Sequence, residues 1–307
     1  MADKYGDNVD FATQKNGWEF TKAFHKTSYA AISPERPELK KAGKTVLITG
    51  GNQGIGFEIA RSYIKALASK VIISGRRADA VASSAAELAK EASSGTKVEG
   101  RVCDVSKPSD IKELWEGLEK DGIEIDILVL NAAAFAPPKT LMEAGTEAIW
   151  HDYMVNTRAT LDFTERFYKQ QPTDKQKYLV GVSTMAIHNF VVTADRPGYS
   201  LTKNAGTLAL QLIAKDTSPE KMQIINFHPG GVFTNAARLS GLEENSYQWD
   251  DASLAADFAV WAATPEARFL HGRFVWANWD VDELKTGSIR EKIDNDPAFL
   301  RIGVNGV

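Results

Sequence analysis

The sequence has almost no cysteine, no long apolar run and no strong charge of either sign. Its 307 residues contain one cysteine, Cys103, which excludes an intramolecular disulfide framework and favours a reducing compartment. No apolar run approaches the ~20 residues that cross a bilayer, and the polar N-terminus lacks a signal-peptide core. The net charge of −4 gives no reason to expect nucleic acid or an anionic membrane as a partner. We therefore expect a cytoplasmic globular protein that binds neither nucleic acid nor membranes.

From Lys44 onward, short apolar runs alternate with amphipathic stretches. This alternation predicts an α/β fold, a doubly wound Rossmann-type parallel sheet of about seven strands with helices on both faces. Strands are expected at 44–49, 70–75, 97–103, 126–130, 177–183, 222–227 and 273–277. Helices are expected near 55–68, 78–94, 108–120, 145–170, 198–216 and 251–263. Residues 234–250 read as a loop or short helices placed to cover a ligand at the carboxyl ends of the strands.

Residues 1–43 show no clear period and form a predicted N-terminal extension of a single domain over 44–307. Pro34 and Pro37 discourage a helix near 33–38. The segment is rich in aromatic side chains, namely Phe11, Trp18, Phe20, Phe24 and Tyr29. Because such side chains seldom stay in water, we expect the extension to pack on the body of the protein. Lining a substrate entrance or an interface is the alternative.

A glycine-rich turn follows the first predicted strand, over Thr49-Gly50-Gly51-Asn52-Gln53-Gly54-Ile55-Gly56. A strand that passes through glycines directly into a helix presents unpaired backbone N–H groups at the helix start, which suits the diphosphate of a dinucleotide. Gly50 would supply a turn conformation, Gly54 a close approach to phosphate, and Gly56 close helix–strand packing. A turn of this kind alone is weak support for dinucleotide binding.

The end of the second predicted strand bears on the choice of cofactor. About 20 residues beyond the glycine turn, where an acidic side chain would bind the ribose of NAD, the sequence has Gly75, followed by Arg76 and Arg77. A guanidinium forms paired hydrogen bonds with a 2′-phosphate. This favours NADP(H), and the alternative is a solvated arginine pair at the start of a helix.

Tyr199 and Lys203 are four residues apart in a predicted helix and so share one face. We expect the Lys203 ammonium to lower the pKa of the Tyr199 phenol, which would make it a proton donor or acceptor. A predicted strand ends just before this helix at Ser183-Thr184, and a later one ends at Pro229-Gly230-Gly231-Val232-Phe233-Thr234.

With these motifs in this order, residues 44 to 280 resemble the short-chain dehydrogenase/reductase family, in its single-domain branch. Tyr199 and Lys203 match the family's catalytic Tyr-x-x-x-Lys, and Asn156 matches the helix asparagine that holds a water in a proton relay. The resemblance implies carbonyl reduction or its reverse, with Tyr199 moving the proton. The resemblance and the glycine turn together give the expected cofactor-binding residues Gly50, Asn52, Gln53, Gly54, Ile55, Gly56, Gly75, Arg76, Arg77, Asp104, Val105, Asn131, Ala132, Ala133, Tyr199, Lys203, Pro229, Gly230, Val232 and Thr234.

The chain departs from the family pattern at two places. Leu130 and Ala133 replace the first Asn and the Gly of Asn-Asn-Ala-Gly. The family commonly reads Ser-Ser-x-Ala where this chain has Ser183-Thr184-Met185-Ala186, so the substrate-binding hydroxyl is assigned to Thr184, with Ser183 as the alternative. Strand alternation points their side chains to opposite faces, so one of them serves.

The substrate is expected to be a hydrophobic small molecule carrying a carbonyl or alcohol. An apolar pocket is predicted from Phe190, Val191, Val192, Phe233, Leu239 and Trp249, which core or lid packing explains equally well. The histidines His151, His188, His228 and His271 lack metal-ligand spacing and are interpreted as structural, so no metal is expected.

Three further expectations follow from the resemblance. The pattern looks like fungal members of the family, which often serve secondary metabolism, and family members usually form homodimers or homotetramers through the two long helices. Non-redox chemistry on the same fold (dehydration, isomerisation or cyclisation) is one alternative to carbonyl reduction. A non-catalytic NADP(H)-binding regulator is the other.

Overall fold

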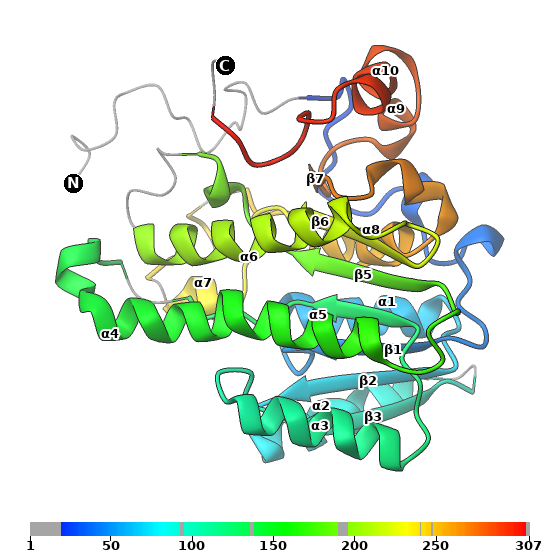
Figure 1. The fold of residues 1–307 in the computed structure, drawn as a ribbon, viewed down its shortest axis with the longest axis vertical. Helices are drawn as coiled ribbons and strands as arrows, with labels where there is room; N and C mark the ends of the chain where they lie inside the picture. Colours follow the sequence, from blue (N-terminus) through cyan, green and yellow to red (C-terminus); the bar gives the residue numbers. More distant parts are fainter. Residues whose placement is uncertain are drawn as a thin grey trace.

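The computed structural model describes residues 20–92, 95–135, 138–189, 196–239, 241–246 and 248–304. Over these residues seven parallel strands form one sheet in the order β3-β2-β1-β4-β5-β6-β7, which confirms the predicted fold class (Figure 1). The strands are β1 Thr45–Thr49, β2 Lys70–Gly75, β3 Lys97–Val102, β4 Ile127–Leu130, β5 Lys177–Val182, β6 Met222–His228 and β7 Phe274–Trp276. The helices are α1 Gly54–Lys65, α2 Ala78–Glu91, α3 Pro108–Lys120, α4 Leu141–Tyr153, α5 Ala159–Lys169, α6 Pro197–Lys215, α7 Asn235–Leu239, α8 Ala252–Ala262, α9 Val281–Leu284 and α10 Gly287–Asn295.

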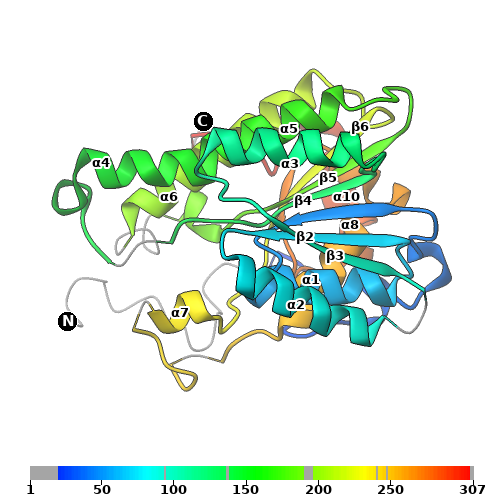
Figure 2. The ribbon, with the colours of Figure 1, turned by 90° about the horizontal axis from the view of Figure 1, so that it is seen from below.

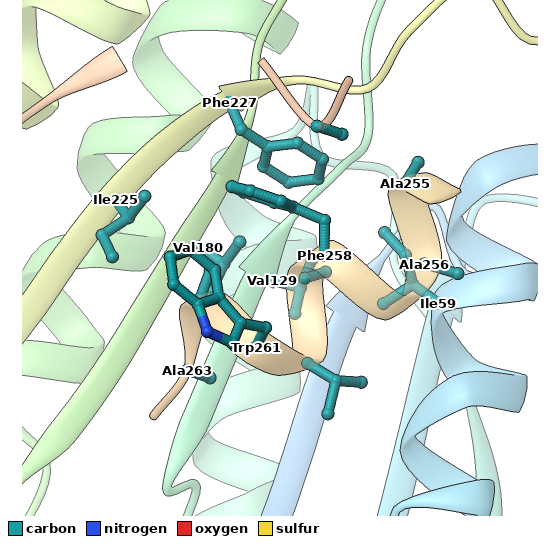
Figure 3. Close-up of a cluster of buried hydrophobic side chains, with 14 of the residues drawn as sticks. Ile59, Val129, Val180, Ile225, Phe227, Ala255, Ala256, Phe258, Trp261 and Ala263 are labelled. Atoms are coloured by element: carbon teal, nitrogen blue, oxygen red, sulfur yellow. The ribbon is translucent and has the colours of Figure 1, made fainter. Parts of the chain in front are cut away.

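Helices cover both faces of the sheet, with α1 and α2 on one side and α3, α5 and α6 on the other (Figure 2). Because side chains alternate along a strand, Val46 and Ile48 enter the core beneath α1 and α8, whereas Leu47 enters the core beneath α3 and α5. Figure 3 shows Phe258 and Trp261 of α8 packed over the central strands. The central strands are buried on both faces, as a parallel sheet requires.

The strand register brings the site loops together at one edge of the sheet. Ile48 of β1 pairs with Val129 of β4, and Val182 of β5 pairs with Phe227 of β6. The loops that follow β1, β4, β5 and β6 therefore leave the sheet side by side. The order of strands reverses between β1 and β4, which is where open α/β sheets bind ligands.

The structure differs from the expected single helix over 145–170. After α4, residues Met154–Arg158 form a π-helical segment, and only then does α5 begin. Gly145 within α4 has a φ of 77°, so the regular part of α4 starts beyond it. The π-helical segment is a single short turn inside a longer helical stretch, and the prediction of one helix over 145–170 did not include it.

The described part of the N-terminal extension packs against the C-terminal part of the chain. Phe24 forms an isolated β-bridge with Trp279, and the Phe20 ring lies 4.6 Å from the Trp279 ring. Ile32 and Leu39 are fully buried. The two aromatic residues Phe11 and Trp18 lie outside the described residues. Over the described ranges, none of the helices has the length and apolar character to span a bilayer.

Candidate active site

A cavity of about 680 Å³ opens at the carboxyl edge of the sheet. Its walls come from the loops after each of the strands β1 to β6, with further residues from α4 and α6. Every residue predicted for the site lines this cavity except Gly56, Arg77 and Asn156. Residues separated by almost 200 positions in the chain thus share one space, whose volume is in the range of small-molecule and cofactor sites.

The glycine turn has the conformation that its sequence predicts. Gly50 and Gly54 have φ values of 65° and 53°, which favour glycine. A Cβ on Gly56 would lie 2.4 Å from the Gly50 carbonyl oxygen, so this position needs glycine for close approach. The Gln53 side chain makes no capping bond to α1, which leaves the first N–H groups of α1 open to the cavity.

Asn131 and Thr49 hold the turn against the end of β4. The Asn131 amide donates to the carbonyl oxygens of Thr49 (3.0 Å) and Gly50 (3.1 Å). The Thr49 hydroxyl in turn accepts from the backbone N–H groups of Asn131 and Ala132. The Asn131 side chain is therefore occupied by the turn itself and fixes its shape.

The end of β2 forms the far wall of the cavity. A Cβ on Gly75 would lie 2.3 Å from Asn52 Oδ1, so a larger residue there would displace the turn. Arg76 is exposed and lines the cavity, whereas Arg77 is the N-cap residue of α2 and does not. Burial opposes the ionisation of Asp104, but the hydrogen bonds from Ser106 and the charges of Lys107 and Arg76 together outweigh it, so the pKa of the Asp104 carboxyl is lowered.

The two hydroxyl candidates after β5 differ in their bonding. The Ser183 hydroxyl is buried and lies 2.6 Å from the Thr207 hydroxyl. Thr207 donates its only hydroxyl hydrogen to the Lys203 carbonyl oxygen (2.8 Å), so Ser183 is the donor to Thr207. Thr184 is half-buried, and its hydroxyl accepts from the Ala186 N–H and hydrogen-bonds the Tyr199 phenol.

The expected effect of Lys203 on Tyr199 is not found. Burial raises the pKa of Tyr199 to about 12, and the groups that oppose this rise are Thr184 and the charge of Arg196. The Lys203 ammonium donates to the Val182 carbonyl oxygen (2.7 Å), and burial lowers the Lys203 pKa to about 8. The predicted lowering of the Tyr199 pKa was wrong, because it considered the charge of Lys203 and left out the desolvation of both groups.

Asn156 does not line the cavity but lies in the π-helical segment behind it. Its amide nitrogen donates to the Thr202 hydroxyl (2.9 Å) and to the Ala134 carbonyl oxygen (3.1 Å). Its amide oxygen accepts from the Ala134 N–H (2.9 Å). The Asn156 side chain thus joins the loop after β4 to α6 on either side of the cavity.

The loop after β6 is held from behind by a buried carboxylate. Gly230 has a φ of 87°, and a Cβ there would lie 2.5 Å from Asp250 Oδ2. The same oxygen accepts from the Gly231 N–H (2.8 Å) and from the Asn278 amide (3.0 Å). Asn278 also donates to the His25 carbonyl oxygen, so the N-terminal extension is connected to this loop.

Several cavity residues were missed or interpreted otherwise. His151 and His228, taken as structural, line the cavity, as do Phe135 and Asp152. His271 is structural, since its ring bonds three backbone groups. Among the residues that the structure describes, no cluster of His, Cys, Asp or Glu has the makings of a metal site.

The predicted apolar pocket is placed only in part. Trp249 lines the cavity and its ring lies 5.3 Å from that of Phe233, which does not line it. Phe190, Val191 and Val192 lie outside the described residues, as does the side chain of Leu239. Phe135 supplies an aromatic wall that was not predicted, edge-to-face with Tyr199 at 4.9 Å.

Comparison with known proteins agrees with this geometry. The sequence pattern described as short chain dehydrogenase matches residues 44–245. A "Short chain dehydrogenase/reductase" of Claviceps purpurea (strain 20.1) is 34% identical over 92% of this chain and 94% of its own length. "Short chain dehydrogenase/reductase nsrO" of Aspergillus novofumigatus (strain IBT 16806) is 33% identical over 92% of this chain and 96% of its own.

Among solved structures, the NADPH-dependent 3-quinuclidinone reductase from Rhodotorula rubra has the same fold. Its TM-score is 0.68 at 21% identity, with 85% of this chain and 99% of that chain covered. The fold, the matched residues 44–245 and the fungal relatives agree. The chain belongs to the short-chain dehydrogenase/reductase family.

Proposed function

We propose that this chain is an NADP(H)-dependent oxidoreductase that interconverts a carbonyl and a secondary alcohol on a hydrophobic small molecule. The observation that carries the proposal is the hydrogen bond between Thr184 and Tyr199 in the cavity that also receives the open start of α1. Two hydroxyl groups that meet at one point are suited to hold a carbonyl oxygen and to exchange its proton.

The residues around the glycine turn fit a dinucleotide phosphate. The uncapped N–H groups of α1 would hold the diphosphate, and Arg76 would meet a 2′-phosphate beside Gly75, where no carboxylate repels it. The loop from Pro229 to Thr234 would hold the nicotinamide end. The Rhodotorula rubra reductase of the same fold is NADPH-dependent, which supports this choice of cofactor. When bound, NADP(H) supplies or accepts a hydride.

The protein's own residues handle the substrate oxygen and its proton. Thr184, which donates to Tyr199 in this structure, would turn its hydroxyl hydrogen to the carbonyl oxygen of a bound substrate. The Ser183 hydrogen instead stays directed to the buried Thr207 hydroxyl. Tyr199 holds a proton at neutral pH, since its pKa is about 12, and donates it as negative charge develops on the substrate oxygen. Lys203 lies one helical turn further along α6, and Asn156 holds this helix in place through its hydrogen bond to Thr202.

The test is Tyr199→Phe, which removes the proton and little volume. We expect NADPH oxidation with a panel of aromatic and aliphatic ketones to fall by about 100-fold or more, because general acid catalysis contributes about this factor. NADPH affinity, measured by fluorescence titration, separates loss of chemistry from loss of binding. Reduction by Tyr199→Phe at a rate near that of the wild type would refute the proposal.

We also propose assembly into a homodimer or homotetramer through α4, α5 and α6. These helices lie side by side on one face of the molecule (Figure 1) and carry exposed apolar side chains. Trp150 is 63% exposed, Leu161 44%, Leu201 42% and Leu212 55%. Exposed apolar side chains gathered on one face mark interaction surfaces. Light scattering at micromolar protein concentration gives the molar mass of the particle in solution. A monomer would contradict the proposed assembly but would not bear on the proposed chemistry.

A further inference from the structure

Asp152 is a buried carboxyl group without a hydrogen-bond partner among the described residues. It lies in the last turn of α4, is 5% exposed and lines the cavity. Burial raises the pKa of its carboxyl, and the neighbouring His151 opposes that rise. Because the carboxyl group lines the cavity, its oxygens are open to a group that enters the cavity and not to a donor from the protein.

The other two buried carboxyl groups of the described residues each accept hydrogen bonds from protein groups, although Asp250 does so through only one of its oxygens. Asp250 accepts from the Gly231 N–H and the Asn278 amide, and Asp257 accepts from the hydroxyls of Ser28 and Ser62. Those two acids face the protein interior, whereas Asp152 faces the cavity. The difference indicates that the partner of Asp152 arrives with a ligand.

The position of Asp152 relates it to the proposed reaction centre. Its Oδ2 lies 3.7 Å from the place that a Cβ on Gly198 would occupy, and Gly198 directly precedes Tyr199. The carboxyl group therefore borders the start of α6, in the cavity that also contains the Thr184 and Tyr199 hydroxyls. A single small molecule held by its oxygen at Tyr199 would extend past Asp152.

We propose that Asp152 is a specificity residue that selects carbonyl substrates bearing a hydroxyl group, by accepting a hydrogen bond from that hydroxyl. The inference rests on the proposed function, since it needs a carbonyl held at Tyr199. A cationic donor is disfavoured because the Arg196 guanidinium already lies 4.6 Å over the Phe135 ring at this end of the cavity. Phe135 offers an aromatic edge contact beside Tyr199, so the substrate is a hydroxylated, ring-bearing ketone.

The probes are 1-tetralone, the four 1-tetralones that carry one hydroxyl group on the aromatic ring, and the matching methoxy compounds. A methoxy group is similar in size to a hydroxyl group but cannot donate a hydrogen bond. For wild-type protein we expect at least one hydroxyl isomer to exceed its methoxy partner in kcat/KM by about 10- to 100-fold, the range for a hydrogen bond to a charged group. Asp152→Leu should bring this ratio close to one. Asp152→Asn, which keeps an uncharged acceptor and the shape, should lower it part of the way.

The control is Glu147→Gln, an exposed carboxyl on the same helix that does not line the cavity. It should keep the wild-type ratio. Calorimetric titration of the same pairs into NADP⁺-saturated protein gives the ratio as relative Kd, with no turnover required.

An unchanged ratio in Asp152→Leu, or no preference for any hydroxyl isomer in the wild type, would overturn the inference. Tyr199-dependent reduction of plain 1-tetralone would still uphold the proposed function in that case. If no ketone is reduced at all, the proposed function fails, and the ratio of dissociation constants alone decides the role of Asp152.

Discussion

Replacing Thr184 and Ser183 one at a time tests which hydroxyl serves the substrate oxygen. Thr184→Val removes a hydroxyl that bonds Tyr199 and keeps the side-chain volume. Loss of one donor to a developing oxyanion costs about 10²- to 10³-fold in kcat, so we expect a fall of that size. Thr184→Ser, which restores the hydroxyl, should recover most of the rate. In Ser183→Ala the lost bond is the one to Thr207, so the expected cost is about 1 kcal/mol of stability and little activity.

A pH profile distinguishes a chemical role of Thr184 from a structural one. Because the hydrogen bond from Thr184 lowers the Tyr199 pKa, its loss should raise that pKa further. In the direction of alcohol oxidation Tyr199 must accept a proton, so the rate of Thr184→Val should rise only at higher pH than in the wild type. Ser183→Ala should leave the profile in place. A larger loss of kcat/KM in Ser183→Ala than in Thr184→Val would refute the assignment.

Two further substitutions test the cofactor end of the cavity and the connection between the N-terminal extension and Asp250. Arg76→Ala should weaken NADPH binding by about tenfold or more while NADH binding changes little, because only NADPH carries the 2′-phosphate. Fluorescence titration measures the affinity for both nucleotides. Arg77→Ala is the matched control, because Arg77 does not line the cavity. Equal losses for the two nucleotides would contradict the role of Arg76. Asn278→Ala removes a fully buried amide that joins the N-terminal extension to Asp250, so we expect a loss of about 2 to 4 kcal/mol in urea unfolding. A loss below about 1 kcal/mol would mean that this connection does not stabilise the fold.

The fold was predictable because its signals are local. Every strand except the edge strand β3 is a short, mostly apolar run, and the observed strands begin and end within two residues of the expected ones. The glycine turn could be predicted for the same reason, since the φ values of Gly50 and Gly54 favour glycine at fixed positions. A backbone conformation of this kind restricts the residue type at the same position, so it can be recognised in the sequence.

The substrate end of the cavity could not be recognised in the sequence in this way. Asp152, Phe135 and His228 come from three separate elements, and each is an ordinary residue in its own stretch of sequence. Only the packing of α4 against α6 turns the Asp152 carboxyl toward the cavity. The π-helical segment that contains Asn156 was also missed, because it is a single short turn inside a longer helical stretch.

The pKa values in the cavity set the direction in which the proposed chemistry runs best. Burial lowers the His228 pKa to about 3, so this ring is neutral at working pH and lacks the acidic proton of an imidazolium. Tyr199, with a pKa of about 12, is protonated, and Lys203, with a pKa of about 8, is mostly protonated at pH 7. A site in this state is ready to give a proton and poorly able to take one. We therefore expect reduction to exceed oxidation at neutral pH.

If Lys203 restores the proton that Tyr199 gives up, kcat/KM for ketone reduction should be level from pH 6 to about 8 and decline above it. Alcohol oxidation should rise over the same interval, because loss of the Lys203 proton opens a path for the proton that Tyr199 accepts. Initial rates with NADPH and NADP⁺ across pH 6 to 10 measure both limbs. A reduction rate that climbs between pH 6 and 8 would mean that a group in the cavity must first lose a proton. Neither Tyr199 nor Lys203 acts in that way in the reduction proposed above.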